Sequence, residues 1–447
     1  MSGNCLRLGV SAFLLIPVDI NKMKDIMKKN FLKVTLVAAV AAMAGYTHQT
    51  MKKGLYILLC SLLVVSCSFP EKKGEGQEAV GKVLSYAEAL PLRQKYSDLF
   101  SRVEIVSLDT VADFLVADIR QFRYALNRFF VLSGDELLVF DRRGKGMARI
   151  DRRGQGREEY LSIRGFDVSE EDSTVCLLTF PPKLMYFSLD GTFVRECVME
   201  SRGFEMALLP DRSVAVYADN VKRGDTEKPA LLDTYRAEDL RRKSFVQGYS
   251  HWEGKLIPSY QQKRVFTHLP DDKGILFSHP LSNRIYSLTS ADTVEIKYTL
   301  DFGKDNPPLD TPDRVRPETA VTDVVKKYWP VYGFNSCWEN SRYLYVQAFV
   351  GGECTDLLYD KRSFQFYAGW LENDLLQCQM NPVEATDTCL VGYVPTDNLV
   401  HLSEYLRLNP DQKLSEQTKR LMEWADQVGN PVVCLYWKES ETSPLIP

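Results

Sequence analysis

Several residue types and motifs on which enzymes depend are scarce in this sequence of 447 residues. Histidine occurs 5 times and tryptophan 6 times. No Cys-x-x-Cys pair or histidine-rich cluster has the spacing of a zinc site, and no Gly-x-Ser-x-Gly elbow provides a serine nucleophile. Gly154-Gln155-Gly156 is not a phosphate loop, because no helix pattern follows it. The sequence therefore carries no familiar local signature of catalysis and predicts no metal site.

Basic runs are also missing, and after residue 66 no apolar stretch approaches 18 residues. Residues 67–447 hold 47 Lys and Arg against 57 Asp and Glu, a net charge of about -10. An acidic chain repels nucleic acid and favours basic or neutral partners. We therefore expect no nucleic-acid partner and no transmembrane helix in this part of the chain.

The N-terminus carries two export signals in series. The second has Lys52-Lys53, an apolar run from Leu55 to Val65, and then Ser66 and Cys67. As a lipobox, this segment predicts cleavage after Ser66 and lipidation of Cys67. Residues 51–66 would then be a lipoprotein signal peptide and residues 67–82 a flexible tether. The predicted location is the cell envelope, in the outer membrane, facing the periplasm or the cell surface.

The first signal spans residues 27–50. One protein is not expected to carry two complete export signals in series. We expect translation to start at Met51, with residues 1–50 an upstream leader joined by a mis-assigned start. Residues 27–50 resemble the leaders of short secreted peptides of Bacteroidetes, including the NVEAL family. A small secreted peptide of this kind is accordingly one candidate partner.

Seven cysteines follow Cys67, so at least one cannot form a disulfide bond within the chain. Several lie in apolar runs, which favours buried free thiols. A bridge between Cys378 and Cys389 is the alternative if a hairpin brings them together.

From about residue 100, short apolar strands alternate with turns at intervals of about ten residues, which indicates an all-β protein. One pattern recurs: an alternating strand with an aromatic residue, a polar turn, and a further strand. It occurs at residues 137–144, 184–191, 283–288 and 356–362. Such repetition over some 300 residues is typical of a β-propeller.

Two segments carry a family resemblance. Leu138-Val139-Phe140-Asp141-Arg142-Arg143-Gly144, followed by Gly154-Gln155-Gly156 and Glu159-Tyr160, resembles the hallmark of the six-bladed β-propeller, TolB-like lipoproteins of Bacteroidetes. That family usually has Gly-Gln-Gly-Pro-Gly-Glu-Tyr, whereas this chain has Arg157 and Glu158 at the Pro and Gly positions. The resemblance covers residues 83–440 and implies a six-bladed propeller there, followed by a tail at 441–447.

One helix is predicted near the end of the chain. Leu414, Leu421, Met422 and Val428 fall on one face, with Asp411 or Ser415 as the cap. We expect this helix to pack on the propeller as an insertion before the last strand, or else to form part of a groove for a partner.

Arginines cluster between residues 142 and 157, and Arg152, Arg153 and Arg157 are candidate ligands for an anion. The favoured alternative is a solvated hairpin whose arginines pair with nearby carboxylates. Three tryptophans, Trp252, Trp329 and Trp338, are expected at loop tips, where they would stack on a sugar or anchor a peptide. Each could instead belong to a blade core.

His268 and His279 flank one predicted hairpin and would either face the axis or fill the core as structural histidines. The acidic loop from Asp301 to Glu318 is a candidate contributor to a Ca²⁺ site, although an ordinary loop is favoured. No other cofactor is expected.

These observations favour a non-catalytic binding or scaffold module for a peptide, protein or glycan. The alternative is a metal-dependent hydrolase or lyase of the lactonase or carbohydrate type, with ligands gathered from several blades.

Overall fold

The computed structural model describes residues 81–221, 229–247, 264–279, 282–306, 331–425 and 429–438. The chain divides into two compact units, residues 1–77 and 78–447, and every described residue belongs to the second. The predicted leader, signal peptide, lipidation site Cys67 and C-terminal tail lie outside the described residues, as does most of the tether.

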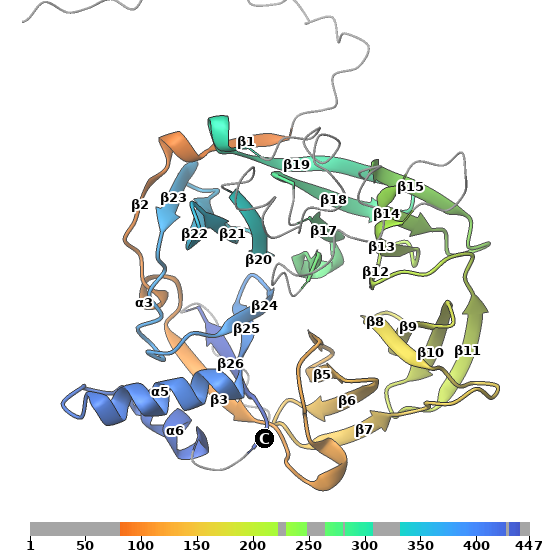
Figure 1. The fold of residues 1–447 in the computed structure, drawn as a ribbon, viewed down its shortest axis with the longest axis horizontal. Coiled ribbons are helices and arrows are strands. Elements are labelled where there is room, and N and C mark those ends of the chain that lie inside the picture. The colour runs from red at the N-terminus through yellow and green to blue at the C-terminus, as the bar shows by residue number, and fades with distance from the viewer. Residues whose placement is uncertain are drawn as a thin grey trace, which may run out of the picture. The chain divides into compact units, whose positions relative to one another are not determined.

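The strands of the described residues form six sheets arranged in a ring (Figure 1). Each sheet is one blade, in which the chain enters at the innermost strand and meanders outward through antiparallel neighbours. The six innermost strands contact one another around the axis of the ring. The fold is therefore a six-bladed β-propeller, as predicted.

The first three blades are four-stranded. From the axis outward, blade 1 contains β4 (Gln121–Ala125), β5 (Arg128–Ser133), β6 (Glu136–Asp141) and β7 (Gly146–Ile150). Blade 2 contains β8 (Ser162–Ser169), β9 (Thr174–Phe180), β10 (Lys183–Ser188) and β11 (Phe193–Val198). Blade 3 contains β12 (Glu205–Leu208), β13 (Val214–Val221), β14 (Ala230–Tyr235) and β15 (Arg242–Gln247).

The other three blades each gain an outer strand from the N-terminal part of the chain. Blade 4 contains β16 (Phe266–His268), β17 (Ile275–Ser278), β18 (Arg284–Ser290), β19 (Thr293–Asp301) and β1 (Lys82–Ser85). Blade 5 contains β20 (Val331–Glu339), β21 (Tyr343–Val350), β22 (Glu353–Asp360), β23 (Gln365–Gly369) and β2 (Leu90–Leu92). Blade 6 contains β24 (Asn381–Ala385), β25 (Cys389–Val394), β26 (Val432–Trp437) and β3 (Arg102–Ser107).

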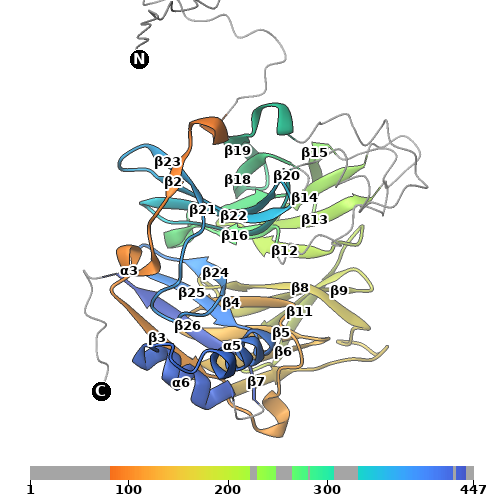
Figure 2. The ribbon, with the colours of Figure 1, turned by 60° about the vertical axis from the view of Figure 1, so that its left-hand side comes forward.

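The N-terminal segment follows the outer edges of blades 4, 5 and 6 in turn (Figure 2). β1 and β2 run parallel to their neighbours, whereas β3 is antiparallel to β26, with Val106 opposite Val433. Blade 6 is thus built from both ends of the propeller sequence. This pairing closes the ring and covers a sheet edge that would otherwise be exposed.

Six apolar clusters fill the spaces between neighbouring blades, one at each junction. Phe130 of blade 1 and Phe166 of blade 2, for example, share one cluster and are fully buried. A strand directs alternate side chains to opposite faces, and both faces of each blade are covered by neighbours. The blades therefore carry apolar residues on both faces.

The repeated pattern in the sequence corresponds to one position in the blade. The third strands of blades 1, 2, 4 and 5 are β6, β10, β18 and β22. The four repeated segments overlap these strands and lie at residues 137–144, 184–191, 283–288 and 356–362. In each, the turn after the strand leads to the next strand of the same sheet.

Two longer helices, α5 (Thr396–Leu408) and α6 (Glu416–Ala425), lie between β25 and β26 and pack against each other and the propeller. α6 is the predicted helix, and Ser415 rather than Asp411 caps it, because Ser415 Oγ accepts the Thr418 N–H at 3.0 Å. The prediction of a single helix is wrong, since α5 precedes it. In the described part of the chain, no helix is long and apolar enough to cross a membrane.

The remaining helical segments are short. They are α3 (Tyr96–Leu99) and the 3-10 turns η1 (Tyr86–Glu88), η2 (Ala112–Phe114), η3 (Pro270–Asp272) and η4 (Gly303–Asp305).

The seven cysteines of the described residues are all free, and four of them are buried. The alternative of a Cys378–Cys389 bridge is wrong. β24 and β25 do form a hairpin, but Cys389 lies at its turn, whereas Cys378 precedes the opposite end, where Asn381 pairs with Tyr393. Burial raises the pKa of both thiols, which suits their packing role.

Candidate functional site

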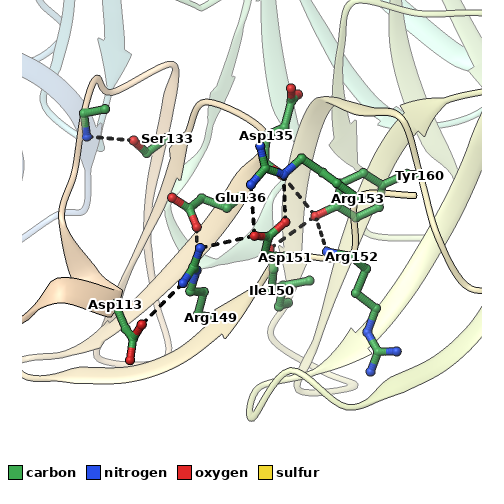
Figure 3. Close-up of polar contacts among 11 residues, drawn as sticks. Asp113, Ser133, Asp135, Glu136, Arg149, Ile150, Asp151, Arg152, Arg153 and Tyr160 are labelled. Carbon is green, nitrogen blue, oxygen red and sulfur yellow. Dashed lines mark hydrogen bonds and ion pairs between the residues drawn. The ribbon is translucent and has the colours of Figure 1, made fainter.

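The first candidate region is the arginine-rich connection, residues 149–161, which joins blade 1 to blade 2 (Figure 3). Arg149 Nε lies 2.5 Å from Glu136 Oε2, and its Nη2 lies 3.2 Å from Asp151 Oδ2. Arg153 forms two hydrogen bonds to the same Asp151 carboxylate, at 2.9 and 3.1 Å. The Arg153 hydrogen bond lowers the pKa of Asp151. These arginines are thus neutralised within the connection.

The candidate anion ligands Arg152, Arg153 and Arg157 are not brought together around one position. Arg153 pairs with Asp151, and Arg152 lies 3.8 Å from the Glu158 carboxylate. Arg157 is exposed and forms no ion pair with another described residue. This arrangement matches the favoured alternative, a solvated surface with local ion pairs.

Tyr160 holds the connection in place. Its ring is fully buried between blades 1 and 2. Its hydroxyl accepts the Arg152 N–H at 3.1 Å and lies 3.1 Å from the carbonyl oxygen of Asp135, to which it can donate (Figure 3). Burial raises the Tyr160 pKa to about 12, so the hydroxyl keeps its proton. The Tyr of the hallmark segment is therefore a structural residue.

Glu158 occupies the position at which the resembled family has glycine, and its φ is +66°. This left-handed conformation is easy for glycine and unfavourable for other residues. The turn therefore keeps the geometry that glycine would adopt although the residue has changed.

The second candidate region is a cluster of charged side chains on the innermost strands, around the axis. Arg123 of β4 contacts Glu384 of β24, and its Nε lies 2.9 Å from Oδ1 of Asp167 on β8. His268 of β16 places Nε2 at 3.1 Å from the other oxygen of Asp167. The half-buried Glu205 of β12 accepts the Val265 N–H at 3.0 Å. Five blades thus contribute charged side chains to the cluster around the axis.

The surroundings shift the pKa values of several members of the cluster. Burial opposes ionisation of Asp167, but His268 and Arg123 outweigh it and lower the Asp167 pKa. Burial and the nearby Arg123 lower the pKa of His268 against the attraction of Asp167. Burial raises the pKa of Glu205 to about 7 against the attraction of Arg264. Each carboxylate thus already faces a cation or backbone donors of the protein.

The two predicted histidines have different surroundings. His268 does belong to the cluster at the axis, but His279 is fully buried, with Nε2 3.2 Å from the Tyr217 hydroxyl. Burial lowers the His279 pKa to about 3. His279 is therefore the structural histidine that the alternative described.

Within the described residues, no group of three or more His, Cys, Asp or Glu side chains is placed to hold a metal ion. Of the acidic loop 301–318, only 301–306 is described, and there Asp301 accepts hydrogen bonds from Gly303 and Asn306. A cavity of about 50 Å³, lined by Gln121, Thr267 and Asn381 among others, lies beside the cluster. It has room for water rather than for an organic ligand.

The expected exposure of Trp338 is wrong. Trp338 lies within β20, is 1% exposed and stacks on Tyr345 with ring centroids 5.3 Å apart. An alternating strand continues through this residue, so its side chain enters the core between blades 5 and 6. Trp252 and Trp329 lie outside the described residues.

The third candidate region is a cleft of about 600 Å³, here named the blade 5 cleft. One wall is formed by strands β21 and β22 of blade 5. The other walls are the segment that joins blade 5 to blade 6 and helix α5. Its aromatic lining consists of Tyr96, Tyr345, Phe349, Trp370 and Tyr405, and its carboxamide lining of Gln347, Asn373, Gln377, Gln379, Asn381 and Gln412. Its volume falls in the range of small-molecule sites.

Asp356 is the buried carboxylate of the blade 5 cleft. One oxygen accepts the Tyr345 hydroxyl at 2.7 Å and Gln347 Nε2 at 2.8 Å, and the other accepts the Leu371 N–H at 2.7 Å. Burial nevertheless raises the Asp356 pKa. No cation pairs with Asp356 among the described residues, in contrast to the carboxylates at the axis.

Two residues of the cleft keep open recognition surfaces. Trp370 and Tyr405 are each 51% exposed, and neither makes a ring contact with a described residue. Asn381 also lines the cleft, but its Nδ2 atom is fully buried and cannot contact a ligand there. The open aromatic faces distinguish the cleft from the other two regions.

Sequence reasoning missed this cleft for a simple reason. Its walls come from residues near 96, 345–356, 370–381 and 402–414, which are distant in the chain. The one available signal was Trp370, which directly follows an alternating strand. Tyr405 lies on helix α5, and because that helix was not predicted, Tyr405 was not recognised as a candidate.

One solved structure agrees with the fold. A solved structure of a Bacteroides fragilis protein described as exported is 15% identical, with a TM-score of 0.64, and covers 80% of this chain and 100% of its own. A member of the DUF4221 family from Bacteroides vulgatus is 9% identical, with a TM-score of 0.44, and covers 75% of this chain and 98% of its own. A comparison with curated proteins finds no match.

At 15% identity, the likeness to the Bacteroides fragilis structure shows the fold alone. A family model described as a domain of unknown function, DUF4934, matches residues 83–436, from the first blade-edge strand to the last strand of blade 6. The chain therefore belongs to the DUF4934 family of six-bladed β-propellers.

Proposed function

We propose that the protein is an exported, lipid-anchored β-propeller that acts as a non-catalytic binding module for a peptide, protein or glycan at the cell envelope. The lipobox ending at Cys67 supports the anchor. The exported Bacteroides fragilis protein with the same fold and the resemblance to TolB-like lipoproteins support export. Lipidation would hold the propeller at a membrane through the segment that precedes β1.

The blade 5 cleft is the observation that carries the binding role. Its aromatic faces and amide groups remain available, whereas the ionic groups of the arginine-rich connection and the axis are largely paired within the protein. A rigid concave surface with a few polar groups is the usual form of a binding site. A catalytic site would instead need a reactive group free to act on a substrate.

Ligand titration tests the binding role. Purified protein titrated with envelope glycans and peptides should bind one class saturably, and mass spectrometry should recover that ligand unchanged. Trp370→Ala should weaken the binding. Turnover of the ligand, or tight stoichiometric Ca²⁺ or Zn²⁺ in elemental analysis, would overturn the proposal in favour of the hydrolase or lyase alternative.

Replacement of the lipidated residue tests the anchor separately. Cys67→Ala should move the protein from the membrane fraction to the soluble fraction and abolish incorporation of labelled fatty acid. A Cys354→Ala variant, which removes a partly exposed thiol of the propeller, is the matched control and should stay in the membrane fraction.

A further inference from the structure

The lining of the blade 5 cleft excludes one class of ligand. No Lys, Arg or His is among its residues, and it contains the carboxylates of Asp356 and Glu372. Glu372 is paired with Lys95 at 2.8 Å outside the lining. A phosphate, sulfate or uronic acid would meet like charge without a compensating cation. The ligand of this cleft is therefore not an anion.

The hydrogen-bonding groups of the cleft also argue against a purely cationic ligand. An ammonium group has donors only. The exposed side chains of Gln379 and Gln412 offer both a donor and an acceptor, as hydroxyl groups do. A hydroxyl-bearing ligand matches this set.

The two half-exposed rings define how such a ligand would lie. Trp370 follows the last residue of β23, and Tyr405 lies on α5, so the rings belong to separate walls of the cleft. Flat aromatic faces bury the apolar surface of a ligand while its polar edge stays hydrated. A pyranose ring has such an apolar C–H face, surrounded by hydroxyl groups.

The sheet next to the cleft is closed to the commonest mode of peptide binding. A peptide that extends a sheet needs an unpaired strand edge. The outer strand of blade 5, β23, is already paired with β2, with Leu90 opposite Tyr367 and Leu92 opposite Gly369. A peptide could not join blade 5 at that edge without displacing β2.

From these four observations we infer that the blade 5 cleft binds a neutral oligosaccharide. One pyranose ring stacks on Trp370 or Tyr405, and its hydroxyl groups hydrogen-bond with the exposed amides of Gln379 and Gln412. This inference rests on the proposed binding function and names its ligand class.

Isothermal titration calorimetry on the purified protein tests the inference. The probes are neutral hexasaccharides of glucose, mannose, galactose and N-acetylglucosamine, with hexagalacturonate and tri-lysine as charged counterparts, each at up to about 5 mM. At least one neutral hexasaccharide should bind saturably, and both charged probes should not. Trp370→Ala should weaken the binding about tenfold, and Gln412→Ala by about three- to tenfold.

Phe364→Ala is the matched control, because Phe364 is 74% exposed on the same blade but does not line the cleft. It should leave the affinity unchanged. Failure of every neutral hexasaccharide to bind would overturn the inference, as would binding that Trp370→Ala and Gln412→Ala leave intact. If a peptide binds instead and Trp370→Ala weakens that binding, the binding function stands and the glycan inference fails. If a neutral hexasaccharide binds but is cleaved, the non-catalytic function fails and the ligand class stands.

Discussion

The arginine-rich connection and the blade 5 cleft both contain residue types that commonly recognise ligands. They differ in how far those residues are paired with other groups of the protein. In the connection, Asp151 receives hydrogen bonds from two arginines, and the polar groups satisfy one another within a few residues. In the cleft, Asp356 has neutral donors only, and the rings of Trp370 and Tyr405 stay open. A dense cluster of charge can thus be structural, whereas the cleft with few charges and open aromatic rings is the surface for which we propose binding.

The largest contrast should appear in stability. Tyr160→Ala removes a fully buried aromatic ring and should lower the free energy of unfolding by about 3–5 kcal/mol. Trp370→Ala removes a half-exposed ring and should cost about 1.5 kcal/mol or less. Urea denaturation followed by circular dichroism measures both. Comparable losses in the two variants would contradict the assignment of the connection as structural and the cleft as open.

The pH dependence of stability should separate the two carboxylates. The Asp151 pKa is lowered by Arg153, so its stabilising contribution is present above the unfolded pKa and is lost as the pH falls through the folded pKa. The Asp356 pKa is raised by burial, so its contribution is unfavourable once the pH exceeds the unfolded value of about 3.9 and grows up to the folded pKa.

The Asp151→Asn and Asp356→Asn variants test this difference. As the pH rises from about 2 to 7, the stability advantage of the unmodified protein over Asp151→Asn should grow. Its advantage over Asp356→Asn should shrink over the same range. Thermal unfolding at a series of pH values measures both, and slopes of the same sign would show that the two carboxylates do not differ as described.

A smaller effect is expected in the turn of the connection. Glu158→Gly places glycine at a φ of +66° and should raise the free energy of unfolding by about 0.5–1 kcal/mol. The lost contact with Arg152, 3.8 Å long and exposed, contributes little. Glu158→Ala serves as the control, because it removes the same carboxylate without relieving the strain, and it should give no gain in urea denaturation.

The smallest effect is expected at Arg157. Because this side chain is exposed and forms no ion pair with a described residue, Arg157→Ala should change the free energy of unfolding by less than about 0.5 kcal/mol. It should also leave oligosaccharide affinity unchanged in calorimetry. A clear loss of ligand binding would show that the arginine-rich connection contributes to ligand binding.

Parts of the fold that depend on local sequence were predictable. The repeated strand-and-turn pattern identified the third strands of four blades, because alternation and turn residues act over a few positions. The helix α6 and its cap Ser415 were predictable for the same reason. The helix α5 was missed, because its apolar face is weak and it follows a buried strand directly.

The candidate site was much less predictable. Trp338 was expected at a loop tip, but its strand neighbours carry it into the core beside Tyr345. Trp370, Asp356 and Tyr405 converge only because blade 5 and the inserted helices are held together by the closed ring. None of these contacts has a signature in sequence spacing.

The sequence by itself determined the blade repeat, the acidic composition and the absence of local catalytic motifs, since each is a property of neighbouring residues or of their sum. Only the tertiary structure decided which polar groups are paired. Ring closure through β3 and β26 brings the innermost strands together, and there Arg123 satisfies Asp167 and Glu384. Hydrogen-bond and ion-pair partners are determined by distance in space and not by distance along the chain.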